Sequence, residues 1–225
     1  MTRTHDRRDV PADGLTRAGV PNLTSTLGIP QEAASTMVQS YTCEFSIVRS
    51  DGVPVTYPLT PYPNQNGLTI DMSIGLIFPW KAELARRQPK VGLSFCVPTT
   101  YHSPSPALVT VRGHAAVRDR DLQGNTDRYV RELMRTFPGM FAGMPGLVLR
   151  RLAFYLARIW VEISPLRVYW WPGGDLDIIP RRWDAPDART RPESDPPPAR
   201  LAQRRSSRFT SPDDWRPGFE IALKT

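Results

Sequence analysis

The chain has 225 residues, 29 of them basic and 22 acidic, and its formal net charge is +7. Acidic and basic residues are interleaved along the chain, which argues against a nucleic-acid-binding protein, because such proteins gather basic residues on one face or tail. Four charged residues break the most apolar stretch, 141–163, and so exclude a membrane span; with no signal peptide and only two cysteines, we expect a cytoplasmic protein.

Both ends of the chain lack the apolar periodicity of helices and strands. Residues 1–30 are polar and rich in turn formers, and residues 179–225 include eight prolines with only scattered large apolar residues. Segments of this composition do not bury enough apolar surface to offset the entropy lost on ordering. We therefore expect disordered segments at 1–30 and 179–225, and one domain at 31–178.

The first half of this domain predicts a helix followed by strands. Residues 31–40 follow Pro30, a favoured residue at the start of a helix. Residues 41–49 alternate between apolar and polar side chains, as in a half-buried strand. A turn at Asp51-Gly52 leads into a second strand at 53–60, and a third strand is expected at 68–73 after the turn at 61–67.

The second half predicts alternating helices and strands. We expect helices at 79–88, 121–137 and 141–158. Strands are expected at 90–97, 107–118, 159–164 and, after a turn at Pro165, 167–171. Six or seven short strands in meander order, with inserted helices, indicate a mainly β (α+β) barrel or sandwich rather than a parallel sheet.

The strand at 90–97 has one face of small residues, Gly92, Ser94 and Cys96. A face of this kind allows close approach of another backbone or of a flat ligand. Ordinary packing of a sheet against a helix explains it equally well.

One constellation indicates a ligand site. The motifs of dinucleotide-binding folds, P-loops and serine hydrolases are absent. Ser73, however, ends a predicted strand, and Lys81 lies in the first turn of the helix that Pro79 begins. A helix N-terminus, a lysine and a hydroxyl together form a phosphate site. The alternative is that Lys81 is a solvated helix residue and Ser73 a turn former.

The order of these segments resembles the FMN-binding split barrels related to pyridoxamine 5′-phosphate oxidase, a superfamily that also includes deazaflavin (F420) reductases. The resemblance covers about residues 36–175 and rests on five short motifs, at 51–58, 71–73, 81–91, 109–115 and 167–174. Among them are a Val-x-Gly-x-Ala strand at 111–115 and the Arg-Val-Tyr-Trp-Trp-Pro-Gly segment that begins at Arg167.

The resemblance implies a six- to seven-stranded split β-barrel that forms a homodimer with FMN, or alternatively F420, in a groove between subunits. The reaction would be hydride transfer to or from a small unsaturated substrate. By position, Ser73 and Lys81 would hold the cofactor phosphate, Thr56 and Tyr57 would lie along the ring, and Trp171 would lie at the subunit boundary. Asp71, Met72 and Trp80 are the other expected cofactor-binding residues.

The chain also departs from the oxidase pattern. Val55 and Trp80 stand where the oxidases usually have arginines, and Asp71 adds a negative charge near the expected phosphate. These departures argue against oxidation of pyridoxamine phosphate itself. Three hypotheses stay open: an FMN- or F420-dependent oxidoreductase, a non-catalytic barrel that binds a flavin, haem or another flat ligand, and a scaffold that uses its arginine-rich tail.

Overall fold

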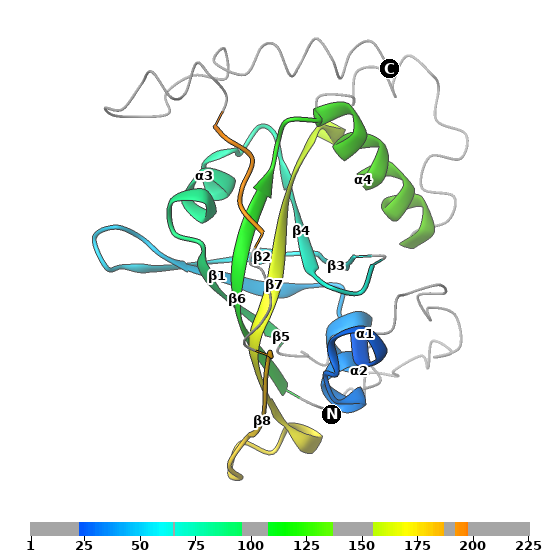
Figure 1. Ribbon diagram of the computed structural model, residues 1–225, viewed down its shortest axis with the longest axis vertical. Coiled ribbons are helices and arrows are strands. Elements are labelled where there is room, and N and C mark those ends of the chain that lie inside the picture. The colour runs from blue at the N-terminus through cyan, green and yellow to red at the C-terminus, as the bar shows by residue number, and fades with distance from the viewer. Residues whose placement is uncertain (1–22, 65, 96–107, 137–154, 187–191, 198–225) are drawn as a thin grey trace, which may run out of the picture.

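The computed structural model describes residues 23–64, 66–95, 108–136, 155–186 and 192–197 (Figure 1). Eight antiparallel strands in this part of the chain form one sheet. They are β1 (Cys43–Val48), β2 (Pro54–Leu59), β3 (Pro61–Pro63), β4 (Ile70–Gly75), β5 (Lys90–Phe95), β6 (Leu108–Arg118), β7 (Arg158–Trp171) and β8 (Arg181–Asp184). The helices are α1 (Leu23–Leu27), α2 (Gln31–Gln39), α3 (Trp80–Arg87) and α4 (Leu122–Thr136), with a 3₁₀ turn, η2, at Pro172–Gly174.

The sheet is a split β-barrel. Its strand order is β2-β1-β5-β6-β7-β4-β3, and β8 pairs with β7 beside this path. β2 and β3 lie at opposite ends of the sheet, yet only Thr60 separates them in the chain. The sheet must therefore curl until its edges meet, and β2 comes into contact with β4 without a ladder of hydrogen bonds between them. This confirms the predicted mainly β architecture with inserted helices.

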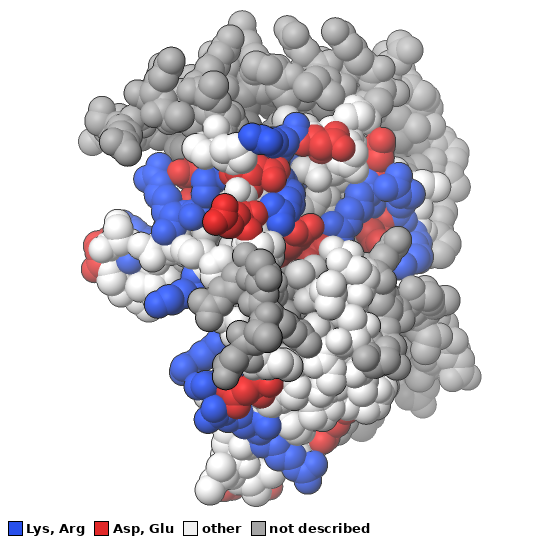
Figure 2. All heavy atoms as spheres, viewed as in Figure 1, with Lys and Arg blue, Asp and Glu red and all other residues white. Residues whose placement is uncertain are grey.

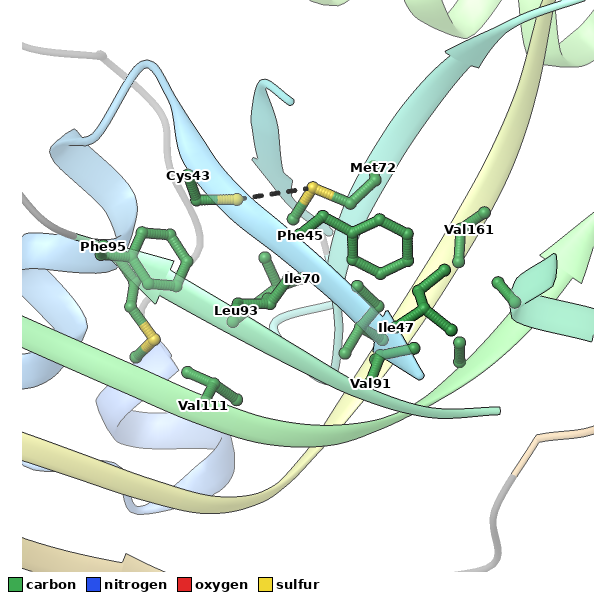
Figure 3. Close-up of a cluster of buried hydrophobic side chains, with 14 of the residues drawn as sticks. Cys43, Phe45, Ile47, Ile70, Met72, Val91, Leu93, Phe95, Val111 and Val161 are labelled. Atoms are coloured by element: carbon green, nitrogen blue, oxygen red, sulfur yellow. Dashed lines mark hydrogen bonds between the residues drawn. The ribbon is translucent and has the colours of Figure 1, made fainter. Parts of the chain in front are cut away.

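The interior of the barrel is apolar, as the alternation in β1 predicts. Cys43, Phe45 and Ile47 point inward and are buried, while the residues between them are exposed or half-buried. Figure 3 shows these side chains against Ile70 and Met72 of β4, with the Cys43 sulfur 3.7 Å from that of Met72. Burial raises the pKa of the Cys43 thiol, which keeps it protonated and unreactive.

β7 is one continuous strand, so the predicted turn at Pro165 was wrong. Pro165 pairs with Gly113 where the register between β6 and β7 shifts. A bulge tolerates proline, because the residue there need not donate a ladder hydrogen bond. The helix expected at 141–158 lies mostly outside the described residues, but Arg158 already belongs to β7.

Both predicted domain boundaries need correction. Leu23 and Leu27 of α1 are buried in the core, so the ordered domain begins before residue 31. At the other end, β8 pairs with β7, and residues 192–197 pack against β6. A five-residue helix and a four-residue strand are too short for hydrophobic periodicity to detect. Residues 1–22 and 198–225 lie outside the described part of the chain.

Two helices flank the upper half of the barrel. α3 packs near β6 and β7, and α4 lies against β7 on the other side (Figure 1). Both helices were predicted, each within one residue of its observed ends. Of the helices in the described residues, none combines the length and the apolar character needed to cross a bilayer.

Candidate functional site

An open groove of about 310 Å³ lies between the β1–β2 hairpin and α3. This volume is at the lower end of the range for small-molecule sites. β2 contributes alternate residues that face the core side of the sheet, and α3 contributes residues three or four apart, which share one helix face. The lining residues are Arg49, Val55, Tyr57, Trp80, Glu83, Leu84 and Arg87.

An aromatic corner forms one end of the groove. The rings of Tyr57 and Trp80 meet edge to face, with centroids 5.0 Å apart. The Lys81 ammonium nitrogen lies 4.9 Å from the centre of the Tyr57 ring and 5.9 Å from that of Phe78. Trp80 is 40% exposed, so an aromatic surface stays open to a ligand. The structure thus brings together Tyr57, Trp80 and Lys81, three of the residues predicted for the site.

The phenol of Tyr57 remains a hydrogen-bond donor. Burial raises the pKa of Tyr57, and the positive charge of Arg49 acts in the opposite direction. The hydroxyl is protonated at neutral pH, as in an ordinary tyrosine, and the raised pKa does not change this. It can therefore donate to an oxygen or nitrogen of a bound ligand.

The charges around the groove favour an anion. The one carboxylate in its lining, Glu83, is held by Arg87 at 2.8 Å and by Arg86 at 3.2 Å. Arg49 pairs with Asp51, which lies at the hairpin turn outside the lining. Lys81 forms no ion pair with the carboxylates of the described residues. A flat ligand that carries phosphate or carboxylate groups matches this set of cations and aromatic rings.

Three residues of β4 that were expected to bind the cofactor lie outside the groove. Asp71 is completely buried, with its carboxylate 2.5 Å from Arg128 of α4 and 2.9 Å from the Asn64 side chain. Met72 points into the barrel core, and Ser73 pairs in register with Trp160. None of the three lines the groove. Side chains alternate along a strand, so Asp71 and Ser73 share the face of β4 opposite to the core.

Thr56 and Trp171 are also outside the groove. Thr56 lies on the opposite face of β2 from Tyr57, and its hydroxyl is 2.8 Å from that of Ser46. Trp171 ends β7, where it pairs with Leu108 of β6, and it does not line the groove.

Sequence reasoning missed Arg49, Glu83, Leu84 and Arg87. Helical spacing was the available signal for α3, since residues 80, 83, 84 and 87 share one face of a helix. Arg49 could be assigned to the groove only from the geometry of the hairpin, in which the N–H of Arg49 donates to the carbonyl of Val53 at 2.9 Å.

A second group of charged residues fastens α4 to the sheet. Burial raises the pKa of Asp71 to about 6, although Arg128 partly counteracts this. The Arg128 guanidinium lies 4.0 Å from the centre of the Trp160 ring, and the Trp160 indole donates to the carbonyl of Asn125 at 3.0 Å. Asp71, Arg128 and Trp160 thus bind one another or the backbone of α4, which connects the helix to the sheet. Among the described residues, no group of His, Cys, Asp or Glu is arranged to hold a metal ion.

On the face shown in Figure 2, basic and acidic side chains alternate in the band between α3 and α4, and a second mixed group surrounds β8. Many of these charges are paired, for example Arg118 with Glu162 and Arg167 with Asp184. A continuous basic surface for nucleic acid is absent from the described residues on this face.

No family model matches the sequence, and no curated protein matches it either. Solved structures do match. One is an F420 reductase, 16% identical over 62% of this chain and 98% of its own, with a TM-score of 0.45. Another is a protein of the pyridoxinephosphate oxidase family from Clostridium acetobutylicum, related to general stress protein 26 of B. subtilis, with 10% identity, coverage of 68% and 92%, and a TM-score of 0.44.

A third structure is HutZ, the haem storage protein of Vibrio cholerae. It is 15% identical over 58% of this chain and 84% of its own, with a TM-score of 0.39. At identities of 10%, 15% and 16%, these similarities concern the fold alone.

Proposed function

We propose that the groove between the β1–β2 hairpin and α3 binds FMN or F420 and that the chain is an oxidoreductase acting on a small unsaturated substrate. The observation that carries this proposal is the aromatic corner, in which Tyr57 and Trp80 meet edge to face beside the Lys81 ammonium. When bound, either cofactor supplies a conjugated ring that accepts or donates a hydride.

The residues that line the groove, and Lys81 beside Tyr57, have separate roles in this proposal. Tyr57 and Trp80 contact the ring, and Val55 and Leu84 exclude water from its apolar edge. Lys81 and Arg87 balance the negative charge of a phosphate, each as a charge-assisted donor. The phenol of Tyr57, which is protonated at neutral pH, donates a hydrogen bond to the ligand.

The groove is large enough for only part of such a cofactor and is open on one side. We propose that a second copy of the chain covers the rest, so that the site is completed in a homodimer. Trp80, which lines the groove, and Phe78, two residues before it, are exposed, and they support the proposal because paired surfaces hide exposed apolar area. The substrate would then enter between the two copies.

A non-catalytic role in binding a flavin, haem or another flat ligand is the second candidate. It is favoured by the state of Glu83, the only carboxylate in the lining, because two arginines occupy it and leave no general base in the groove. Flavin chemistry needs no such base, so this observation does not exclude the first candidate.

Titration of the protein with FMN, F420 and haem, followed by fluorescence or absorbance, tests both candidates. Lys81→Ala removes a charge-assisted hydrogen bond worth roughly 1.5–3 kcal/mol. The affinity for FMN or F420 should therefore fall about ten- to a hundredfold. Lys81→Arg should restore only part of it, because a planar guanidinium does not replace a compact ammonium.

Lys90→Ala is the matched control, since Lys90 is an exposed lysine of β5 outside the groove. If Lys81→Ala and Lys90→Ala bind FMN and F420 alike, the cofactor site is misplaced. Binding of haem alone supports the second candidate. Reduction of bound FMN by a nicotinamide donor, or turnover with reduced F420, supports the first.

A further inference from the structure

Residues 192–197 run alongside the end of β6 and are named the acidic strap here (orange, beside α3 in Figure 1). β5 pairs with β6 only as far as His114, which leaves the remaining edge of β6 open. The acidic strap fills this edge. The N–H of Val117 donates to the Ser194 hydroxyl at 3.0 Å, and the N–H of Asp195 donates to the Val117 carbonyl at 2.7 Å.

The side chain of Asp195 is the anchor of the strap. Its carboxylate accepts hydrogen bonds from the backbone N–H groups of Asp119 at 3.0 Å and Arg120 at 3.1 Å. Arg118 adds an ion pair to Asp195 at 3.4 Å and a hydrogen bond to the Glu193 carbonyl at 2.5 Å. Residues 117–120 thus hold an extended acidic segment in two ways. Their backbone atoms form hydrogen bonds with the strap, and two of their N–H groups bind the Asp195 carboxylate.

Arg86 joins the acidic strap to the groove. This residue of α3 donates to the Asp195 carbonyl and pairs with Asp119. Its Nε atom lies 3.2 Å from Glu83, and Glu83 and Leu84 line the groove. Arg86 is nearly buried, so its position is fixed by these partners. Contacts through Arg86 and Glu83 therefore connect the strap to α3 and to the lining of the groove.

The contacts of the strap are polar, and none of its six residues is buried. Segments with few buried apolar contacts detach at a lower free energy than the core of a fold. We propose that the acidic strap is a detachable docking segment that holds α3 in place and thereby sets the ligand affinity of the groove. This inference rests on the proposed function for the affinity, although its effect on α3 is independent of any ligand.

Two variants of the full chain test it. Asp195→Ala removes the anchoring carboxylate, and Glu193→Ala removes the same charge from a side chain for which the structure shows no contact. The hydrogen-exchange rates of the amides of α3, Asp119 and Arg120 measure, without a ligand, how firmly the strap holds α3. Titration with FMN measures the ligand affinity of the groove.

In Asp195→Ala we expect exchange in α3 to accelerate on the order of tenfold and the FMN affinity to fall about three- to tenfold. Glu193→Ala should match the wild type in both. Asp195→Asn should lie between them, because its amide oxygen still accepts a backbone hydrogen bond but carries no charge for Arg118.

Equal exchange rates of α3 in Asp195→Ala and Glu193→Ala would overturn the inference. Unchanged FMN affinity in Asp195→Ala, with faster exchange, would overturn the link to the groove. If the wild type binds no FMN but α3 responds as expected, the proposed function fails and the hold of the strap on α3 is supported.

Discussion

Asp71 carries a carboxylate with no exposed surface, and its ionisation links the stability of the fold to pH. Burial raises its folded pKa to about 6 from an ordinary value of 3.8, and the ion pair with Arg128 offsets only part of this. Because the folded pKa is raised, the protonated form is the one that folding favours. Protonated Asp71 makes its full contribution to the free energy of unfolding at a pH below its unfolded pKa. This stabilisation is lost as the pH rises through the folded pKa of about 6.

Asp71→Asn imitates the protonated carboxyl and does not titrate. As the pH rises from about 4 to 7, the wild type should lose stability relative to this variant, by at most about 3 kcal/mol at 1.36 kcal/mol per pKa unit. Urea unfolding of both proteins across this range measures the difference. Asp51→Asn, in the exposed pair with Arg49, is the control for the loss of one carboxylate. A difference between wild type and Asp71→Asn that stays constant with pH would refute the prediction.

At the scale of elements, the bulge between β6 and β7 allows β7 to run unbroken past a proline. A Cβ atom at Gly113 would lie 2.5 Å from a methyl carbon of Ile163 and 3.0 Å from the carbonyl oxygen of Ser164. Both atoms belong to the paired strand, so the clash cannot be relieved without moving its backbone. Only glycine fits at this position.

Gly113→Ala should therefore destabilise the fold by about 1–3 kcal/mol, the usual cost of overpacking. Gly92→Ala in the neighbouring strand β5 is the matched control, because the nearest atom to its added Cβ would be 3.8 Å away. Denaturant midpoints of the two variants give the comparison. Equal midpoints would mean that the bulge is free to rearrange.

The elements that the sequence predicted well are those with several turns or alternations. β1, α3 and α4 have enough residues for a period to show. α1, β3 and β8 do not, because they contain three to five residues each. The acidic strap has no period at all, since backbone atoms and a single carboxylate hold it.

The candidate site could likewise be predicted only in part from the sequence. Tyr57 and Lys81 belong to motifs that the sequence carries, Trp80 directly precedes one of these motifs, and the structure brings the three together. Asp71 and Ser73 belong to such a motif too, but β4 turns their side chains away from the core. Which face of a strand meets which helix is decided by tertiary packing, and a motif does not record it.

At the scale of the whole molecule, the open groove and the exposed aromatic rings of Phe78 and Trp80 predict self-association. We expect a homodimer in sedimentation velocity at micromolar concentration, because a second copy would cover this apolar surface. A monomer that still binds FMN would contradict the dimeric site. Dissociation by Trp80→Ala would place the interface beside the groove.

The chain crosses from one end of the sheet to the other at Thr60. β2 and β4 contact each other without a ladder of hydrogen bonds, so they form a seam of the barrel. Tyr57 comes from one side of the seam, and Trp80 from the helix that follows the other side. A ligand that contacts both rings would therefore connect the two sides of the seam. Force applied to the empty protein should open the barrel there first, and a bound ligand should move the point of failure to another part of the sheet.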